Sequence, residues 1–386
     1  MLVFLLLLLA LVSALSSLLA WMPAPVWPGW WKLAIAVGEF GHLLVLLPLG
    51  VAGLAAFALD GWTRGATLAL CGVAVIGLLR PAWTAWRMGA RLPAEMAQSL
   101  GRNGVAPGAE EAFKFARLYF APAPPRAANR TEVFAQGEDG PLELDFFPAA
   151  ASSPAPCLIV VHGGGWDGGD RAQLAEWNHR WAARGYAVAA ISYRLAPRHR
   201  WPAQRDDTLA ALVWLKTHAA RLGIDATRFV FVGRSAGGQI AAAVAYGAED
   251  PAIVGVVSFY APHDMPFAWG VSREDDALNS VNLMRQYLGG APDTPERAAL
   301  YASASAQAMV GPRTPPTLLV HGRPDTLVWY RHSERLAARL REAGVPHHHL
   351  ELPWATHGFD FNPDGPGGQL ADHAIAAFLR RVTQGG

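Results

Sequence analysis

The sequence predicts an α/β protein with a mostly parallel sheet covered by helices on both faces, preceded by an all-α transmembrane region. Two observations carry this prediction. The first 92 residues are dominated by long apolar stretches, whereas from residue 131 onward short apolar runs alternate with segments of helical periodicity. Buried strands that alternate with helices form parallel sheets. Apolar stretches of about 20 residues are long enough to cross a bilayer.

The composition of the 386-residue chain narrows the possible functions. Hydrophobic residues make up 52% and charged residues only 16%, which is more apolar than an average soluble domain. The net charge of +1 gives no reason to expect a nucleic-acid partner. With only Cys71 and Cys157 present, we expect neither a disulfide framework nor a cysteine-based zinc site.

Residues 1–92 are expected to form a membrane region of about three transmembrane helices. The apolar stretches are Met1–Ala20, Leu33–Leu59 and Trp62–Trp83. No Lys or Arg precedes the first stretch, so a retained helix fits it better than a cleaved signal peptide. The third stretch is short between Arg64 and Arg80, and a re-entrant segment remains an alternative there.

Flanking charges predict how this region is oriented. Arg80, Arg87, Arg91 and Arg102 follow the third stretch, while the preceding loop offers only Arg64. The positive-inside rule then places the C-terminal part in the cytoplasm and the N-terminus outside. Glu39 and His42 lie on one helical face near the start of the second stretch, where we expect them at the membrane interface.

Residues 93–130 are expected to connect the two parts. Pro93–Gly108 is punctuated by Gly and Pro, Glu110–Phe120 has the pattern of an amphipathic helix, and Pro122, Pro124 and Pro125 would end it.

Residues 131–386 are expected to form one α/β domain, with a cap insertion at about 266–311 that interrupts the strand–helix alternation. The expected strands are Leu142–Phe146, Cys157–Val161, Tyr186–Tyr193, Phe229–Val232, Ile253–Tyr260, Thr317–Val320 and Leu350–Leu352. The expected helices are Pro202–Leu222, Ile240–Ala245, Trp329–Ala343 and Leu370–Val382.

Gly233-Arg234-Ser235-Ala236-Gly237 lies between one of these strands and the helix after it. This is the Gly-x-Ser-x-Gly pattern of a nucleophile elbow, in which a serine hydroxyl is exposed at a sharp strand-to-helix turn. The alternative is an ordinary Gly/Ser turn, so the assignment depends on partners elsewhere in the chain.

Two candidate partners follow in the order that such a scaffold requires. A serine nucleophile needs a base and a residue that orients the base, and on elbow scaffolds the order is Ser, Asp or Glu, then His. Asp325 follows the strand ending at His321, and His357 follows the next strand. Asp325 alone would better suit the N-cap of a helix that starts near Leu327, and His357 alone a loop histidine, but the three residues in this order predict a catalytic triad.

His162-Gly163-Gly164-Gly165-Trp166 directly follows a buried strand. A glycine run allows backbone amides to approach a substrate carbonyl oxygen closely, as an oxyanion hole requires. No Lys follows at the spacing of a P-loop. Trp166 suits either the wall of a substrate pocket or ordinary core packing.

From about residue 131 to the C-terminus the chain resembles the α/β-hydrolase fold, most closely the HGGG-motif esterase/lipase group related to hormone-sensitive lipase and the small bacterial carboxylesterases. The residues that carry the resemblance are His162–Trp166, Gly233–Gly238, Tyr193–Pro197, Trp201–Ala203, Asp207, Ala210–Leu212, Trp214 and Leu215. Arg234 departs from the group, since many relatives carry an acidic residue there. The resemblance does not extend to the membrane region.

The resemblance implies roles for individual residues. Ser235 would be the nucleophile, His357 the base and Asp325 the residue that orients it, and the amides of Gly164, Gly165 and Ala236 would form the oxyanion hole. Asp207 would be a buried partner, with Arg194 as a candidate for its contact.

The implied activity is hydrolysis of carboxylic esters through an acyl-enzyme, without metal or cofactor, on a small-molecule or lipid-like substrate. The apolar stretches, not the resemblance, predict an integral membrane protein of the bacterial inner membrane, so the lipid bilayer is an expected partner. Amide or formamide hydrolysis and acyl transfer use the same triad and remain alternatives, as does a non-catalytic module that tethers a partner. The oligomeric state stays open.

Overall fold

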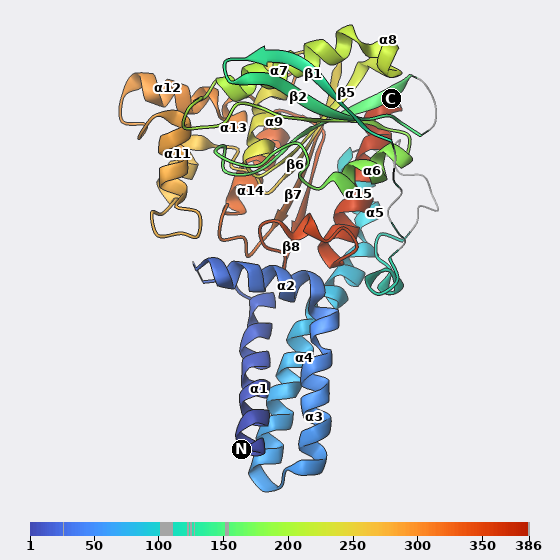
Figure 1. Cartoon of the computed structure of the whole chain (residues 1–386), viewed down its shortest axis with the longest axis vertical. Coiled ribbons are helices and arrows are strands. Elements are labelled where there is room, and N and C mark those ends of the chain that lie inside the picture. Colours follow the sequence, from blue (N-terminus) through green and yellow to red (C-terminus); the bar gives the residue numbers. More distant parts are fainter. Residues whose placement is uncertain are drawn as a thin grey trace.

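A computed structural model of the chain describes residues 1–25, 27–100, 111–121, 123, 126, 128–150 and 154–384. A narrow helical bundle formed by the N-terminal residues stands below a larger α/β domain (Figure 1). The N-terminal helices are α1 (Leu2–Ser17), η1 (Leu18–Ala20), α2 (Pro28–Leu44), α3 (Leu46–Ala58), α4 (Gly61–Gly89) and α5 (Leu92–Leu100).

Helices α1, α3 and α4 run side by side, while α2 lies across their end, between the bundle and the α/β domain (Figure 1). In the described part of the chain, Leu2–Ala20 and Gly61–Gly89 are long and apolar enough to cross a membrane, and α2 with α3 would make a third span if the bent pair counts as one. The 29 residues of α4 form one continuous helix.

The expected second span, Leu33–Leu59, is not straight. Its chain bends by 52° between α2 and α3, and only α3 runs along the bundle. Pro48 lies in the first turn of α3, where its missing N–H is tolerated, whereas in the middle of a continuous helix it would remove a hydrogen bond and clash with the preceding turn.

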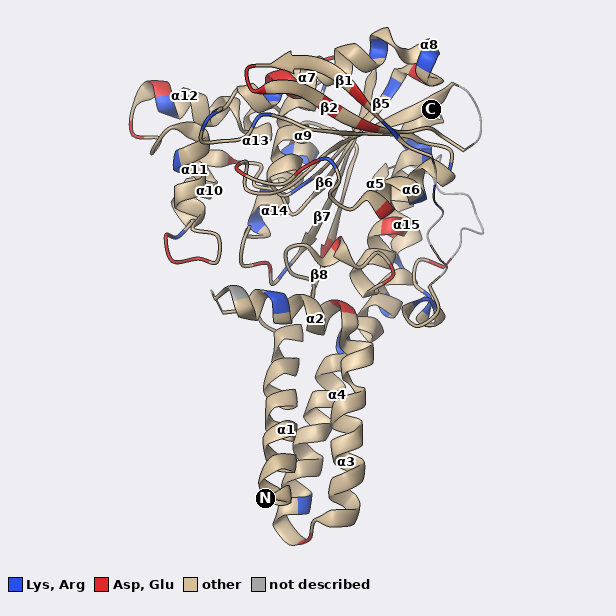
Figure 2. Cartoon of the chain, in the orientation of Figure 1, with Lys and Arg blue, Asp and Glu red and all other residues tan. Residues whose placement is uncertain are grey.

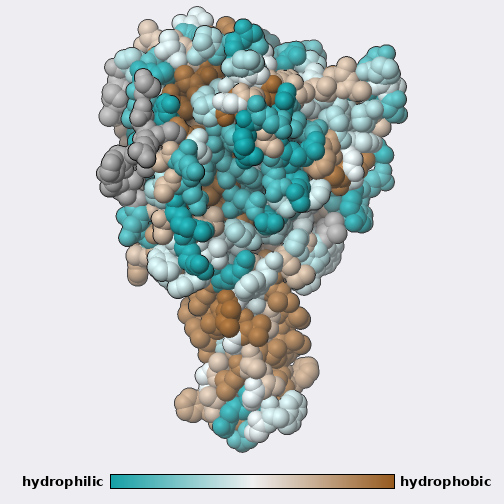
Figure 3. All heavy atoms as spheres, turned by 180° about the vertical axis from the view of Figure 1, so that it is seen from behind, coloured by the Kyte–Doolittle hydropathy of each residue, from teal (hydrophilic) through white to brown (hydrophobic). Residues whose placement is uncertain are grey.

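The bundle has an apolar surface with charges confined to its ends. At the tip, Arg64 pairs with Asp60 at 2.8 Å, and the next charged residues lie near the α/β domain (Figure 2). Figure 3 shows a hydrophobic band between the polar domain and the polar tip. Leu8, Leu49 and Ile76 are among the large apolar side chains exposed there.

The prediction of an amphipathic helix at Glu110–Phe120 is wrong for those of its residues that the structure describes. Glu110 and the prolines 122, 124 and 125 lie outside the described residues, and between them the structure has only a short 3₁₀ turn, η3 (Phe115–Leu118). Gln369 explains the difference, because its side-chain amide accepts a hydrogen bond from Lys114 N at 2.9 Å and donates one to Lys114 O at 3.3 Å. These are backbone groups that a helix would use.

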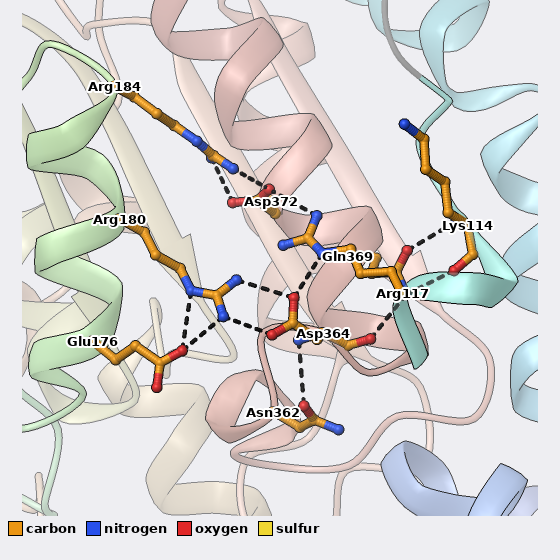
Figure 4. A network of polar contacts seen from close by, with 9 residues as sticks. All are labelled: Lys114, Arg117, Glu176, Arg180, Arg184, Asn362, Asp364, Gln369 and Asp372. Atoms are coloured by element: carbon orange, nitrogen blue, oxygen red, sulfur yellow. Dashed lines mark hydrogen bonds and ion pairs between the residues drawn. The ribbon is translucent and has the colours of Figure 1, made fainter. Parts of the chain in front are cut away.

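An ionic network fastens this connecting segment to the α/β domain (Figure 4). Asp364 accepts hydrogen bonds from Arg117 and Arg180, each with a contact at 2.6 Å. Asp372 pairs with Arg184 at 2.7 Å and with Arg117 at 3.6 Å. Burial would raise the pKa of Asp364, but the two arginines outweigh it and hold the pKa below its ordinary value.

The α/β domain is built on an eight-stranded sheet of order β1-β2-β4-β3-β5-β6-β7-β8, antiparallel from β1 through β2 to β4 and parallel from there on. The strands are β1 (Arg130–Gly137), β2 (Gly140–Phe147), β3 (Ala155–Val161), β4 (Ala187–Ile191), β5 (Ile224–Arg234), β6 (Ile253–Phe259), β7 (Thr317–Gly322) and β8 (His347–Leu352). The expected α/β fold with a mostly parallel sheet is confirmed.

Helices cover both faces of the sheet, and the side chains of each strand alternate between two cores. Cys157, Ile159 and Val161 of β3 join one core, while Leu158 and Val160 join the other. The helices of the domain are α6 (Ala175–Ala183), α7 (Ala203–Thr217), α8 (Ala219–Leu222), α9 (Ala236–Ala248), α14 (Arg331–Glu342) and α15 (Pro366–Thr383), with a short 3₁₀ helix η4 (Phe359–Phe361). The single helix expected at Pro202–Leu222 is divided at His218 into α7 and α8.

The expected cap interval contains four helices: α10 (Met265–Val271), α11 (Ser280–Leu288), α12 (Pro295–Ser303) and α13 (Ala306–Met309). They follow β6 and precede β7, and α11 contributes Leu283 and Met284 to the space above the ends of the strands.

Candidate active site

Ser235 stands at a sharp turn between β5 and α9. Its backbone has φ +54° and ψ −123°, a conformation that costs free energy for any residue with a side chain. The neighbouring glycines make the turn possible. A Cβ atom at Gly233 would lie 2.2 Å from the carbonyl oxygen of Gly237, and one at Gly237 would lie 2.2 Å from that of Val161.

The structure brings Ser235, His357 and Asp325 together. Ser235 Oγ lies 2.9 Å from His357 Nε2, and His357 Nδ1 lies 2.8 Å from Asp325 Oδ2. The three residues follow β5, β7 and β8, whose carboxyl ends share one edge of the parallel sheet. This is the arrangement in which an imidazole can take a proton from a serine hydroxyl while a carboxylate holds the ring.

Asp325 is fixed by the chain that follows it. Its Oδ1 accepts hydrogen bonds from Leu327 N at 2.9 Å and Val328 N at 3.0 Å. Helix α14 begins only at Arg331, so Asp325 is not its N-cap. Burial alone would raise the pKa of Asp325, but His357 and His321 outweigh burial and hold the pKa below its ordinary value, so the carboxylate is ionised at neutral pH.

Two residues that sequence reasoning missed support this triad. His321 is fully buried, with Nε2 3.3 Å from Asp325 Oδ2 and Nδ1 2.7 Å from Ser333 Oγ. The ring of Tyr260 lies 4.4 Å from that of His357, centroid to centroid. His321 is the strand residue four positions before Asp325, which is a signal the sequence offered, but nothing local identifies Tyr260.

The glycine-rich loop lies next to Ser235. The amide of Gly163 donates to Gln173 Oε1 at 2.8 Å, whereas the amides of Gly164 and Gly165 donate to no acceptor in the described part of the chain. Ala236 is the first residue of α9, and amides of a first helical turn have no intrahelical partner. These three N–H groups are therefore free to bind a developing negative charge.

Trp166 is buried beside the candidate nucleophile. Its ring stacks on Tyr287 at 4.4 Å, and its Nε1 donates to Gln239 Oε1 at 2.8 Å. Gln239 also accepts from the Tyr287 hydroxyl at 3.0 Å, so the cap helix α11 is tied to α9 through this cluster. Trp166 thus both packs in the core and lines a cavity that contains Ser235.

Ser235 borders two cavities, one of about 340 Å³ and one of about 660 Å³. Residues common to both are Gly165, Ser235, Leu278, Leu283 and Leu327. An ester has two arms that diverge from its carbonyl carbon, and two cavities that meet at the nucleophile provide a separate space for each arm.

The departure at Arg234 has a structural explanation. Its guanidinium pairs with Asp360 and lies over the rings of Trp177 and Phe259 at 4.9 and 5.0 Å. It is 3% exposed and helps to fix the chain after His357. The expected contact of Asp207 with Arg194 is also present, with Arg194 Nη2 2.7 Å from Asp207 Oδ1.

Comparisons with known proteins agree with this architecture. Residues 144–340 match the model of the BD-FAE family. The esterase LipC of Mycobacterium tuberculosis is 32% identical over 60% of this chain, a match that spans 59% of the length of LipC. LipM of the same organism, named a probable carboxylic ester hydrolase, is 26% identical over 97% of this chain and 92% of its own length.

Among solved structures, esterase LipW from Mycobacterium marinum superposes with a TM-score of 0.54 and 27% sequence identity, covering 77% of this chain and 89% of LipW. The family model covers about half of the chain, and the strand order, the elbow and the relatives agree with it. The chain therefore belongs to the BD-FAE family and is an α/β-hydrolase of the esterase group.

Proposed function

We propose that this protein is a membrane-anchored serine hydrolase that cleaves carboxylic esters through an acyl-enzyme. The observation that carries the proposal is the pair of contacts from Ser235 Oγ to His357 Nε2 and from His357 Nδ1 to Asp325 Oδ2, at 2.9 and 2.8 Å. The names of the relatives, esterases and a probable carboxylic ester hydrolase, support ester over other acyl substrates.

In this proposal Ser235 Oγ attacks the ester carbonyl carbon while His357 takes the hydroxyl proton. The negative charge on the carbonyl oxygen is bound by the amides of Gly164, Gly165 and Ala236, a type of contact worth about 3 kcal/mol for one donor. The C–O bond to the alcohol then breaks, and His357 protonates the leaving oxygen. Water, deprotonated by His357, attacks the acyl-enzyme and releases the carboxylic acid and Ser235.

The membrane part of the proposal rests on the N-terminal bundle. Its apolar band, its two to three helices of membrane-spanning length and its polar tip fit an integral membrane anchor. The LipM match extends over 97% of the chain and so includes this region. Figure 2 shows basic residues where the bundle meets the domain and at its tip. Lys32 belongs to α2, Arg80 and Arg87 to the last third of α4, and Arg91 follows α4, whereas Arg64 lies in the first turn of α4. This distribution favours a cytoplasmic domain.

Labelling and kinetics test the catalytic proposal. The full chain in detergent should react with a fluorophosphonate probe at Ser235, and Ser235→Ala should lose labelling together with at least about 10⁴-fold in kcat on aryl esters. Ser99→Ala, on α5, is the matched control and should retain both. Unchanged ester turnover in Ser235→Ala would refute the proposal. A matched pair of aryl ester and aryl amide separates esterase from amidase activity.

A further inference from the structure

The membrane region reaches into the candidate active site. Pro23 and Ala24, from the loop that leads into α2, line the smaller of the two cavities at Ser235. Trp31 and Ile35, from α2 itself, line the larger. Both cavities therefore combine walls from the catalytic domain with a wall from the N-terminal region.

Contacts on either side of His357 hold this wall in place. Trp31 Nε1 donates a hydrogen bond to the backbone oxygen of His357 at 3.0 Å. The side-chain carboxyl group of Glu39, which is fully buried, accepts hydrogen bonds from Trp354 Nε1 at 3.3 Å and from Gly367 N at 3.0 Å. Helix α2 is thus bound to the chain before and after the catalytic histidine, and its position relative to Ser235 is fixed.

Helix α2 also lies at the level where the proposed membrane surface meets the catalytic domain. It lies across the end of the bundle, directly beneath the α/β domain (Figure 1). Trp21, Met22 and Trp27, in the loop beside it, are each more than half exposed, and exposed Trp side chains of this kind are typical of the level of lipid headgroups. A cavity walled by Trp31 and Ile35 therefore lies where hydrocarbon chains enter and leave the bilayer.

From these observations we infer a substrate class: an ester of a long-chain amphiphile resident in the bilayer, whose hydrocarbon chain lies in the larger cavity against Trp31 and Ile35. The inference rests on the proposed esterase function. The membrane region then serves as part of the substrate-binding site as well as an anchor. Ile35 lies close to the backbone of Gly358, since a Cβ atom added at Gly358 would be 3.9 Å from Ile35 Cδ1. The size of the Ile35 side chain therefore limits the space beside His357.

Paired substitutions at Ile35 test the inference in the full chain reconstituted in phosphatidylcholine vesicles. The readout is the ratio of kcat/KM for 4-nitrophenyl palmitate to that for 4-nitrophenyl acetate. Ile35→Trp narrows the cavity and should lower the ratio about tenfold, while Ile35→Ala widens it and should raise the ratio. Opposite shifts from two substitutions at one site cannot result from a general loss of folding.

Ile76 on α4, which is 66% exposed on the bundle surface, provides the matched control. Ile76→Trp and Ile76→Ala should leave the ratio unchanged. Ratios that do not move with Ile35, that move in the same direction for both substitutions, or that move equally with Ile76 overturn the inference. Fluorophosphonate labelling of Ser235 in the unsubstituted protein separates the two proposals, because an unlabelled Ser235 would overturn the esterase function itself.

Discussion

At the scale of single residues, burial and near neighbours set the charge of the groups around the sheet edge. Asp325 is buried yet stays ionised, because two histidines and two backbone amides surround its oxygens. His348 on β8 shows the opposite balance. It is 8% exposed, and its Nδ1 lies 2.9 Å from Ser99 Oγ of α5. Burial, with a smaller contribution from His347, lowers its pKa from 6.5 to about 4.

The low pKa of His348 predicts a loss of stability in acid. The unfolded chain binds the proton near pH 6.5 and the folded chain only near pH 4, so the unfolded state gains protons, and stability falls, as the pH drops through this window. For His348 the loss between pH 7 and pH 5 is about 2 kcal/mol.

In His348→Gln the new side-chain amide can still form a hydrogen bond with Ser99, but it does not titrate. This variant should therefore lack the pH-dependent loss of stability that His348 causes. Denaturant unfolding of both proteins in detergent at several pH values measures it. The free-energy difference between the two proteins should change by about 2 kcal/mol between pH 7 and pH 5, and parallel curves would contradict the expectation.

At the scale of elements, α2 links two parts of the chain that have different tasks. Trp31 of α2 donates a hydrogen bond to the backbone oxygen of His357. Glu39, further along the same helix, accepts hydrogen bonds from Trp354 and Gly367. The ionic network around Asp364 holds the chain a few residues beyond His357 (Figure 4). The loop that carries the candidate catalytic base is therefore supported by elements from outside the sheet.

Trp31→Phe is expected to slow catalysis more than it weakens substrate binding. Phenylalanine keeps most of the cavity wall but lacks the N–H group, so the carbonyl of His357 loses its partner, at a cost of about 1 kcal/mol. We expect kcat to fall about fivefold while KM changes little, measured in steady state with a short aryl ester. Trp30→Phe, on the same helix with a 40% exposed side chain, is the control. Equal effects of the two substitutions would mean that the hydrogen bond has no positioning role.

At the scale of the whole molecule, the bundle and the sheet are arranged so that the carboxyl edge of the sheet faces α2. Arg80 lies at the junction, donating to the backbone oxygen of Ala20 and lying 4.3 Å from the ring of Trp21. An arginine beside an interfacial tryptophan is typical of the membrane surface. In the proposed membrane-anchored arrangement, the candidate active site would lie against that surface.

The charge asymmetry of the bundle predicts a cytoplasmic catalytic domain. A green fluorescent protein fused after the last residue should be fluorescent, and alkaline phosphatase fused at the same point should be inactive, because the phosphatase needs an oxidising compartment for its disulfides. Fusions placed in the tip loop between α3 and α4 should behave in the opposite way. Active phosphatase at the C-terminus would invert the predicted topology.

The sequence by itself determined the features that depend on local patterns. The alternation of short apolar runs with helical segments predicted the sheet and its covering helices, because burial on two faces leaves that pattern in the residues themselves. Ser235, Asp325 and His357 could be found because each follows a strand of a parallel sheet and because their order along the chain is diagnostic. The apolar bundle could also be predicted, because its long apolar stretches are visible directly in the sequence.

Only the tertiary structure decided what depends on contacts between distant segments. The helix expected at Glu110–Phe120 is replaced by a turn because Gln369, more than 200 residues later, binds the backbone of Lys114. Trp31, Tyr260 and His321 lie around the triad through packing that no local pattern encodes. The bend after Leu44 separates α2 from α3, and α2 then lies against His357. Such positions follow from how the elements pack, and packing is a property of the whole chain.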